Sequence, residues 1–397
     1  MKSSVVIGAN WGDEGKGLIT DYLCKKYNAD LVVRFNGGAQ AGHTVVTPEG
    51  KRHVFSHIGS GFFLGVPTYL TKDFILNPIA FKKEYTELNA TRDYKIFISY
   101  GSLVTTYWDM LANRAIEEMR EGDAHGSCGL GINATIGRSD SVSFTMPMSI
   151  AIATTYNDVK DMLTTILRYW QQKLTGFSKM MNKPIPEWVT ECFERSDEIN
   201  MQFIDDLRFM LDVTEPSFFS KILTGKGHMI FEGAQGLALD QFYGNYPYVT
   251  RSNTGMRNVV DLLRKNDGMF SIDEIVYVSR TYETRHGNDP AFSCSEQDRE
   301  MFGGFIDKTN IRNDYQGELR YRELAYPRLA NRARLDLEAN NLWPPDAERS
   351  VRLALTHADQ LAVDERGLEE FKDRTGHGIP LFYEASGETR DDVKADE

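Results

Sequence analysis

Two carboxylates and a lysine lie within a glycine-rich segment near the start of the chain. The segment "WGDEGKG", residues 11–17, joins the apolar run "VVIGA" to the helical pattern "LITDYLCKKY". A glycine-rich turn from a strand to a helix presents backbone N–H groups and the positive helix end to a phosphate, and Lys16 adds a charge. Acids beside a bound phosphate need a divalent cation between them or a role as a base, so Asp13 and Glu14 indicate chemistry at this turn.

The segment differs from the common phosphate-binding motifs. Gly17 stands where the P-loop has its Ser or Thr magnesium ligand, and Asn10 stands where it has its first glycine. The dinucleotide-binding pattern Gly-x-Gly-x-x-Gly is not matched either. A lone glycine turn is equally well a tight connection, and an exposed Asp-Glu pair is usually a solvated helix cap. The functional interpretation therefore needs a second site that agrees with it.

A second glycine-rich segment ends in a histidine. "RFNGGAQAGHT", residues 34–44, follows an apparent strand and places His43 at the tip of a turn. A lone histidine is more often structural than catalytic, but a turn after a buried strand is where α/β sheets bind ligands. This segment agrees with the first.

A third segment, residues 231–255, reads "FEGAQGLALDQFYGNYPYVTRSNTG". An apparent strand ends in Gly-Ala-Gln-Gly, and the aromatic turn "GNYPYVT" follows it. Buried amide and hydroxyl groups, such as those of Gln235 and Thr250, could read the edge of a base or its phosphate.

Short apolar runs and helical patterns carry these segments. The strand candidates are "SVVIGA", "ADLVVRF", "YKIFIS", "GHMIFEGA", "DEIVYVSRTYE", "VRLALTHAD" and "IPLFYEA". Their near-continuous apolarity suits strands buried on both faces. Helical patterns such as "NPIAFKKEYTEL", "TTYWDMLANRAIEEMREG" and "ELAYPRLANRARLDLEANN" lie between them. The alternation predicts an α/β fold with a large, mainly parallel central sheet and helices on both faces.

Residues of about 151–226 break this alternation. "NDVKDMLTTILRYWQQKL" and "EINMQFIDDLRFMLD" have amphipathic helical patterns, and the proline-bearing "NKPIPEW" joins them. We interpret this range as a helical insertion within a single domain of residues 1–397. The polar C-terminal "ETRDDVKADE" predicts a frayed end.

Composition excludes several classes of protein. A net charge of −12 and a pI near 5.3 argue against a protein that wraps a nucleic acid, because such binding depends on many Lys and Arg contacts. The four cysteines form no Cys-x-x-Cys pair, so neither a disulfide framework nor a zinc site is indicated. No run reaches the length of a membrane span and no signal peptide is apparent. We expect a cytoplasmic protein without nucleic-acid or membrane partners.

Taken together, these motifs resemble those of the adenylosuccinate synthetases. "WGDEGKG" matches the first loop of that family in full, "AGHT" its second loop and "FEGAQG…YPYVT" its third. "YETRHGNDP" is similar to the family's Thr-Arg-Val-Gly-x-Gly-Pro turn, "LALTHADQL" to its base-recognition loop Leu-Thr-Lys-x-Asp, and "EASGETR" to its final Ser-Thr-Gly turn. The resemblance spans nearly the whole chain, with the motifs in the same order.

The resemblance implies a carbon–nitrogen ligase. Asp13 would remove the N1 proton of a 6-oxopurine nucleotide, so that O6 attacks the γ-phosphate of a nucleoside triphosphate, and His43 would act as general acid. Lys16 and Gln235 complete the implied catalytic set. Mg²⁺, held by Asp13 and the Gly42 carbonyl, would neutralise the migrating phosphoryl group. L-Aspartate then displaces the 6-phosphoryl group.

The same resemblance implies the binding residues. The triphosphate would be held by Gly12, Glu14, Gly15, Lys16, Gly17, Gly42, Thr44, His357, Asp359 and Gly387. The purine nucleotide would be held by Asp13, Gln40, Ser127, Cys128, Arg138, Gln235, Thr250 and His286, and aspartate by Thr284, Arg285, Arg320 and Arg322. A homodimer is implied as well, with Arg138 reaching the substrate phosphate of the partner subunit.

Departures from the family are concentrated at the substrate. Ala39-Gln40 replaces His-Asn, Ser127 and Cys128 replace two threonines, and "GELRYREL" replaces a run of four arginines. Rebuilt base and sugar contacts beside intact catalytic residues favour another substrate. dGMP, the substrate of viral relatives, is favoured narrowly over IMP, and a viral protein would work in the host cytoplasm. The donor stays open: Asp359 suits GTP, whereas His357 in place of the family's lysine leaves ATP or dATP as rivals.

Two other classes remain. An inactive nucleotide-binding homologue is disfavoured because Asp13, Lys16, His43 and Gln235 are all present. A generic triphosphate hydrolase or switch is disfavoured because the loop lacks the Ser or Thr magnesium ligand.

Overall fold

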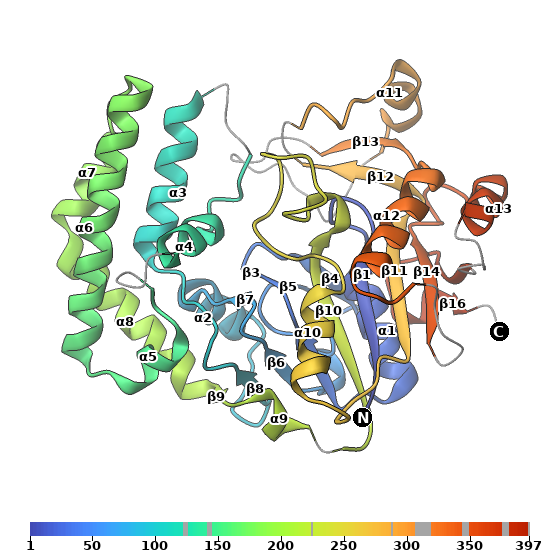
Figure 1. The fold of residues 1–397 in the computed structure, drawn as a ribbon, viewed down its shortest axis with the longest axis horizontal. Coiled ribbons are helices and arrows are strands. Elements are labelled where there is room, and N and C mark those ends of the chain that lie inside the picture. Colours follow the sequence, from blue (N-terminus) through green and yellow to red (C-terminus); the bar gives the residue numbers. More distant parts are fainter. Residues whose placement is uncertain are drawn as a thin grey trace.

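A ten-stranded sheet forms the centre of the computed structural model, which describes residues 1–121, 126–140, 145–223, 225–286, 289–305, 319–343, 349–374 and 381–395 (Figure 1). Across the sheet the strands run β16 (Val393–Ala395), β15 (Leu381–Ala385), β14 (Ser350–Thr356), β11 (Glu274–Arg280), β1 (Lys2–Gly8), β10 (His228–Gly236), β2 (Leu31–Arg34), β6 (Thr68–Leu70), β8 (Ile96–Ile98) and β9 (Glu215–Pro216). All neighbours pair in parallel except β15 and β16. The predicted α/β class and mainly parallel sheet are confirmed.

Three two-stranded pairs lie outside the central sheet. β4 (His43–Val46) with β5 (Arg52–Phe55) and β12 (Tyr282–Arg285) with β13 (Arg320–Glu323) are antiparallel, whereas β3 (Gly37–Gly38) with β7 (Phe74–Ile75) is parallel. Two of these pairs carry predicted site residues, His43 on β4 and Arg285 on β12.

Helices cover both faces of the sheet because alternate side chains of each strand point to opposite faces. Val5 and Ile7 of β1 share a core with α10 (Arg257–Lys265) and α12 (Tyr326–Ala339). Val6 shares another core with α1 (Lys16–Tyr27). In Figure 1, α10 and α12 lie in front of the strands and α1 lies behind them. α11 (Glu296–Phe302) and α13 (Glu365–Arg374) lie on the right of Figure 1, the side on which the chain ends.

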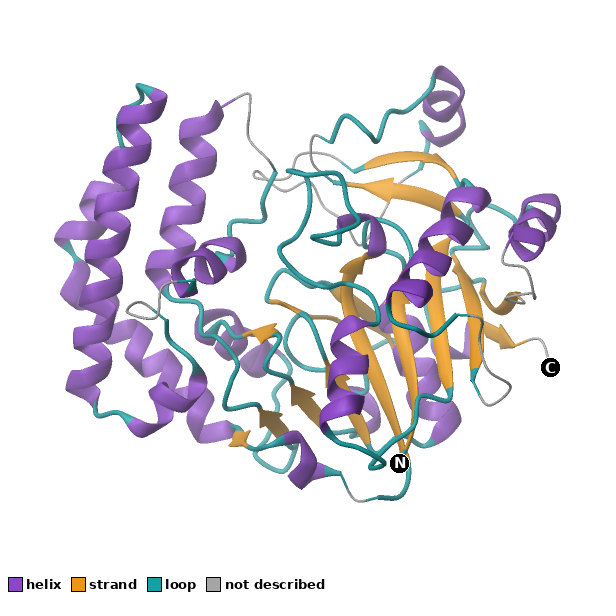
Figure 2. Cartoon of the chain, viewed as in Figure 1, coloured by secondary structure: helices purple, strands orange, loops and turns teal. Residues whose placement is uncertain are grey.

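A bundle of helices packs beside the sheet, on the left of Figure 2. Its members are α2 (Pro78–Glu87), α3 (Tyr107–Arg120), α4 (Ile132–Ser139), α5 (Met148–Ala153), α6 (Tyr156–Met181), α7 (Glu187–Glu194) and α8 (Ser196–Val213). The short α9 (Phe219–Ile222) lies below the sheet in Figure 1, with Phe219 in the main core. The predicted helical range 151–226 contains the second half of α5 and all of α6 to α9. The helical part begins earlier than predicted, with α3, because Trp108 and Leu111 share one core with Leu163 and Leu207.

The expectation of a frayed C-terminus is wrong. β16 pairs antiparallel with β15 and closes one edge of the sheet, with Val393 buried opposite Ala385. The polar composition of this segment suits an edge strand, since one side of such a strand faces water.

Candidate active site

The first glycine-rich segment forms the turn between β1 and α1, and its second acid faces inward. The Glu14 carboxylate is buried and accepts hydrogen bonds from the backbone N–H of Asn10 (3.1 Å) and of Gly12 (2.8 Å). Lys16 Nζ lies 2.6 Å from the same carboxylate. The side chain of Glu14 thus holds the turn in shape, and the predicted contact of Glu14 with the triphosphate stays a prediction for its backbone.

Asp13 points elsewhere. Its backbone has a φ of 61°, and its side chain is 29 % exposed, with Oδ2 at 3.7 Å from Nε2 of His286. Arg280 donates to the Asp13 carbonyl at 2.5 Å. The left-handed conformation of Asp13, uncommon for a residue with a side chain, therefore turns the two neighbouring acids in different directions.

Two glycines of this turn are required by close packing. A side chain at Gly17 would lie 2.7 Å from the Thr44 carbonyl oxygen on β4, and one at Gly15 would lie 3.0 Å from Thr356. Gly15 also has a φ of 87°, which favours glycine. The absence of a Ser or Thr at position 17 thus has a steric cause, since the start of α1 lies directly against β4.

His43 lies in a buried cluster of charged groups at the end of β2 and β10. Its Nδ1 is 2.6 Å from Oε1 of Glu232, and Ser60 also donates to Glu232. Burial lowers the pKa of His43 to about 4. Although burial alone would raise the pKa of Glu232, Arg34, His43 and Ser60 together lower it to about 2. The imidazole is therefore neutral, with its Nδ1–H directed at the carboxylate.

The other nitrogen of His43 has no hydrogen-bond partner among the described residues, although it is buried. The amide oxygen and nitrogen of Gln40 are buried and unpartnered as well. Gln235 has a φ of 65° and lies beside the first turn, because a side chain at Gly12 would be 3.9 Å from its Oε1. Buried polar groups normally have partners, so these groups are suited to a ligand.

The predicted aspartate-binding residues lie on the β12–β13 pair, where Thr284 is opposite Tyr321 and Arg285 opposite Arg320. Arg285 is buried; its Nη2 donates to the Tyr248 carbonyl at 3.0 Å, whereas Nε and Nη1 have no partner among the described residues. Burial lowers the pKa of Arg285 to about 10, so it stays charged. Two free, buried donors of one guanidinium suit a carboxylate.

Arg320 and Arg322 are already engaged. Arg320 donates to the Phe292 carbonyl at 2.7 Å, and Arg322 Nε pairs with the buried Glu283 at 2.5 Å. Arg322 also lies over the rings of Phe292 and Trp11. Of the predicted aspartate ligands, Arg285 has the clearest free hydrogen-bonding capacity.

The predicted triphosphate loop at residues 356–360 lies beside the first turn. Thr356 donates to the Glu14 carbonyl at 2.8 Å and is 2.8 Å from Nδ1 of His357. Asp359 is exposed. The final turn, with Gly387, is joined to this loop because Ala358 N–H donates to the Ala385 carbonyl at 3.0 Å. Four loops far apart in the sequence thus meet at the carboxyl ends of the strands, where α/β sheets bind ligands.

Arg138 does not lie where it was predicted to act. It is fully buried and donates to both carboxylate oxygens of Asp109, at 2.8 and 3.0 Å, and to the Val104 carbonyl. The Arg138 guanidinium is thus directed at groups of its own subunit. In this structure Arg138 therefore supports the helical bundle, and its contact with a substrate phosphate stays a prediction.

The other predicted purine contacts lie on two loops. Ser127 exchanges hydrogen bonds with Asn113, at 2.9 and 3.1 Å, and burial raises the pKa of the Cys128 thiol. Thr250 follows the exposed aromatic turn, and its N–H donates to the Leu239 carbonyl at 2.8 Å. Neither loop has an unpartnered buried polar atom among these residues.

Several residues of the site were missed from the sequence. Glu232 orients His43, Arg280 supports Asp13, and Arg332 of α12 donates to Asn10. Glu232 stands within "FEGAQG", but nothing local to that motif indicates that it pairs with a histidine 189 residues away.

A magnesium ion fits the groups that face the site. No three His, Cys, Asp or Glu side chains gather into a metal-binding group in the described part of the chain. Mg²⁺ commonly takes only one or two carboxylates together with substrate phosphates and water. Asp13, with its partly exposed carboxylate, and the exposed Gly42 meet that limited requirement.

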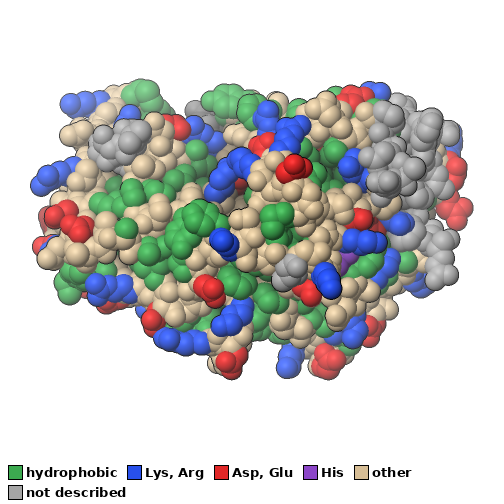
Figure 3. Space-filling model, turned by 60° about the horizontal axis from the view of Figure 1, so that its bottom comes forward, with side chains coloured by type: hydrophobic (Ala, Val, Ile, Leu, Met, Phe, Trp, Pro, Cys, Tyr) green, Lys and Arg blue, Asp and Glu red, His purple; other side chains and the backbone are tan. Residues whose placement is uncertain are grey.

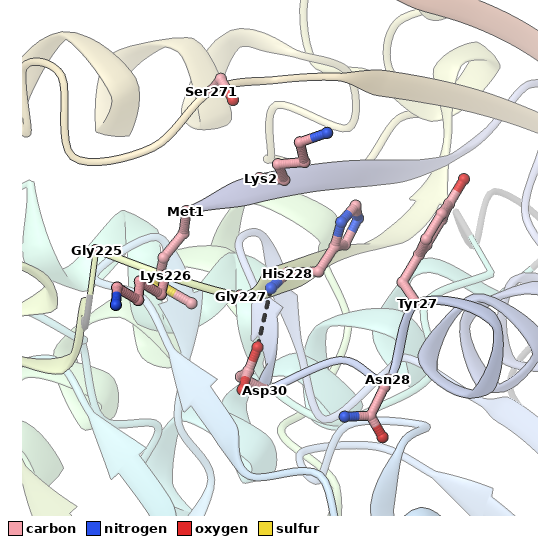
Figure 4. Close-up of a pocket in the computed structure, with 10 residues that line it drawn as sticks. All are labelled: Met1, Lys2, Tyr27, Asn28, Asp30, Gly225, Lys226, Gly227, His228 and Ser271. Carbon is pink, nitrogen blue, oxygen red and sulfur yellow. Dashed lines mark hydrogen bonds between the residues drawn. The ribbon is translucent and has the colours of Figure 1, made fainter.

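A hollow of about 670 Å³ lies at the amino ends of the central strands, opposite to the end that carries the predicted site (Figure 4). Lys2 of β1, His228 of β10 and Tyr27 at the end of α1 line it. Because this hollow lies at the amino ends of the strands, it is separate from the predicted site.

On the face drawn in Figure 3, hydrophobic side chains gather toward the helical side, whereas basic and acidic side chains are interspersed. Among the described residues, no helix is both long and apolar enough to cross a membrane.

Comparisons with known proteins agree with this site. The model of the family described as adenylosuccinate synthetase matches residues 5–310. Adenylosuccinate synthetase of Picrophilus torridus is 32 % identical over 72 % of this chain and 63 % of its own length, and that of Francisella tularensis subsp. novicida is 31 % identical over 73 % and 65 %. The matched part of the chain thus spans less than two thirds of the length of these relatives.

Two solved structures share the fold. A fully ligated adenylosuccinate synthetase from Plasmodium falciparum superposes with a TM-score of 0.75 at 16 % identity, covering 99 % of each chain. The succinoaminodeoxyadenylate synthetase of cyanophage S-2L, bound to dGMP and dATP, gives a TM-score of 0.59 at 17 % identity, covering 99 % of this chain and 95 % of its own. Because the family model matches most of the length of this chain, the chain belongs to the adenylosuccinate synthetase family.

Proposed function

We propose that this protein is a carbon–nitrogen ligase that joins L-aspartate to C6 of a 6-oxopurine nucleotide, driven by hydrolysis of a nucleoside triphosphate. The observation that carries the proposal is a set of buried polar groups that have no hydrogen-bond partner within the described part of the chain. They belong to Gln40, His43, Arg285 and His286, each predicted to contact a substrate or the reacting phosphoryl group. Desolvated groups of this kind cost free energy unless a ligand completes their hydrogen bonds.

The first chemical step in this proposal belongs to Asp13. Its carboxylate accepts the N1 proton of the purine, which places negative charge on O6, and O6 then attacks the γ-phosphorus. The leaving diphosphate carries the electron pair of the broken P–O bond. Lys16 and the N–H groups of the turn would stabilise the phosphate charge, since phosphoryl transfer depends mainly on positioning and electrostatics.

His43 needs a proton before it can act as an acid. In the free site its Nδ1–H faces Glu232 and its Nε2 carries the lone pair. Anionic phosphates beside Nε2 would raise the pKa of His43 from its value of about 4. We infer that the charged form, able to donate from Nε2 to a phosphoryl oxygen, is populated only in the presence of substrates.

Asp13 and the Gly42 carbonyl are the groups proposed to hold Mg²⁺. When bound, the ion would supply positive charge to the phosphoryl oxygens. The chain's own contribution is to present one carboxylate and one carbonyl while Glu14 keeps the turn rigid.

The aspartate step is proposed to use the β12–β13 pair. The free donors of Arg285 would hold a carboxylate of L-aspartate, with Thr284, Arg320 and Arg322 around it. The amino group then attacks C6, forms the C–N bond and releases the 6-phosphoryl group as inorganic phosphate.

dGMP is the nucleotide that we propose, as in the cyanophage enzyme bound to dGMP and dATP. A carboxylate facing N1–H can also accept from the 2-amino group of guanine, so Asp13 is compatible with this base. IMP is the second candidate, because the curated relatives of about one-third identity are named adenylosuccinate synthetases. The donor would be GTP if Asp359 pairs with the base, and otherwise ATP or dATP.

We propose a homodimer acting in the cytoplasm, or in the host cytoplasm for a viral protein. If Arg138 reaches the substrate phosphate of the partner subunit, its pairing with Asp109 must first open. Light scattering of the purified protein would give the oligomeric state.

One assay tests the proposal. Phosphate release is measured with aspartate and Mg²⁺ for IMP, GMP and dGMP, each with GTP, ATP or dATP. We expect aspartate-dependent release, with the highest kcat/KM for dGMP. Slow release that does not need aspartate would indicate a triphosphate hydrolase, and nucleotide binding without any release would indicate an inactive homologue.

A further inference from the structure

Trp11 lies between the proposed base and the proposed aspartate site. It directly precedes Gly12 and Asp13, and its buried ring meets Phe292 edge to face at 4.9 Å. Two guanidinium groups lie against the same ring: that of Arg322 at 4.8 Å and that of Arg332 at 4.3 Å from its centroid. Trp11 therefore connects the first turn to β13 and to α12.

Arg332 contacts three separate parts of this region. Its Nη1 donates to the side-chain oxygen of Asn10. The side-chain nitrogen of Asn10 in turn donates to the Ser279 hydroxyl at 2.9 Å. The same nitrogen lies 3.7 Å from Oε1 of Glu283, the carboxylate that also pairs with Arg322. One side chain thus joins the residues before Asp13 to the strand pair that carries Arg285.

The helix that carries Arg332 is fixed in place. Leu329, Ala333 and Leu337 of α12 are buried in the main core. A guanidinium on a packed helix is a firmer anchor than one on a loop, because its backbone has little freedom to follow the turn. Burial lowers the pKa of Arg332 to about 10, which leaves it charged at neutral pH.

Arg332 differs from Arg285 in what its donors do. Arg285 has two buried donors without a partner among the described residues, as expected for a group that receives a ligand. Arg332 has no buried, unpartnered atom in the described part of the chain, and its Nη1 is already bonded to Asn10 within the protein. Arg332 therefore links the first turn to the β12–β13 pair.

We propose that Arg332 is a positioning residue: through Trp11, Asn10 and Glu283 it fixes the turn that carries Asp13 relative to the arginines that receive aspartate. This inference rests on the proposed function. The phosphate cradle has separate supports, Glu14 and Thr356. Loss of Arg332 should therefore harm the step with aspartate and leave triphosphate binding unchanged.

The test compares Arg332→Met with Arg334→Met. Arg334 lies two residues further along α12 and faces Glu338 at 3.7 Å, away from the site. For Arg332→Met we expect kcat/KM for aspartate to fall about tenfold or more, with the Kd for Mg²⁺–ATP and Mg²⁺–GTP unchanged within about twofold. Arg332→Lys, which keeps the charge without the planar fork, should recover part of the loss. Arg334→Met should behave as the wild type.

A double-mutant cycle with Trp11→Leu separates positioning from simple loss of packing. If Arg332 acts through Trp11, Arg332→Met should add little to the loss already caused by Trp11→Leu. Additive losses, an unchanged kcat/KM for Arg332→Met, or an equal loss of triphosphate binding would each overturn the proposal. If Arg332→Met does not fold, Arg332→Lys with Trp11→Phe gives the same cycle.

Failure of the proposed function would look different. In that case the wild-type protein itself shows no aspartate-dependent phosphate release. Urea unfolding of the same single and double variants would then test the contact of Arg332 with Trp11. Non-additive shifts of the unfolding midpoint would support the contact, and additive shifts would oppose it.

Discussion

Glu232 and His43 form a buried pair at the centre of the site, with Oε1 of the carboxylate 2.6 Å from Nδ1 of the imidazole. The carboxylate fixes both the ring orientation and the tautomer, because an ionised carboxylate can only accept a hydrogen bond. Nε2 is thereby directed into the site without a partner among the described residues. The same logic holds the histidine of a Ser-His-Asp triad.

Replacing Glu232 by Gln should impair catalysis more than folding. The amide keeps an acceptor for Nδ1–H but removes the negative charge that stabilises a protonated imidazole. We expect kcat to fall by about 10- to 100-fold, measured by phosphate release at saturating substrates. Glu274→Gln, at a buried carboxylate near the amino ends of the strands, is the matched control and should keep kcat. Equal effects of both changes would argue against an orienting role.

Acid should destabilise the protein through His43. Its pKa is about 4 in the folded protein, below the ordinary value of 6.5. The unfolded chain therefore binds the proton first as the pH falls, and stability is lost between pH 6.5 and pH 4, by about 3 kcal/mol in total. Urea unfolding of the wild type and of His43→Gln at several pH values tests this. As the pH falls, the free energy of unfolding of the wild type should decrease more than that of His43→Gln. A constant difference between the two proteins would contradict the assignment.

Asp336 should act in the opposite direction. Burial raises its pKa from 3.8 to about 7, although Met256 N–H and the Tyr277 hydroxyl donate to it. The folded protein thus keeps a proton that the unfolded chain releases, and stability falls by about 4 kcal/mol as the pH rises from 4 to 7. Asp336→Asn should remove this dependence. The free energy of unfolding of the variant should therefore rise relative to that of the wild type as the pH rises. A parallel pH profile for the two proteins would show that Asp336 is ionised in the fold.

Asp13→Asn should abolish turnover while leaving the fold intact. The amide has the same shape but cannot accept the N1 proton, so kcat/KM for the purine nucleotide should fall by about 10²- to 10⁴-fold. Asp93→Asn, at an exposed position, provides the control. Near-normal rates for Asp13→Asn, with an unchanged unfolding midpoint, would show that the base is another group.

Arg285→Met should weaken aspartate binding specifically. The change removes the two free donors and the charge, so the KM for aspartate should rise about tenfold or more. The KM for the triphosphate should stay the same, because Arg285 lies on β12, whereas the proposed phosphate cradle is the β1–α1 turn. Arg299→Met, at an exposed arginine of α11, is the control. A rise in the triphosphate KM alone would reassign Arg285.

The sequence by itself determined the fold class, and it predicted the loops that we propose to carry the chemistry. The seven apolar runs all became strands of the central sheet, β1, β2, β8, β10, β11, β14 and β15, because continuous apolarity is required of strands covered on both faces. Glycine turns after strands were likewise readable, since the need for a left-handed residue is local, as at Gly15 with its φ of 87°. These features depend on neighbours along the chain.

Only the tertiary structure decided which side chains meet. Glu14 turned inward, Glu232 paired with His43 and Arg138 became a buried partner of Asp109. Arg332 reached Asn10 across 322 residues. Such pairs depend on the order of the strands and on how α12 packs against them, and no local pattern in the sequence encodes that order. The physical reason is that a charged side chain takes its role from the groups that replace its water, and those groups are chosen by the packing of distant elements.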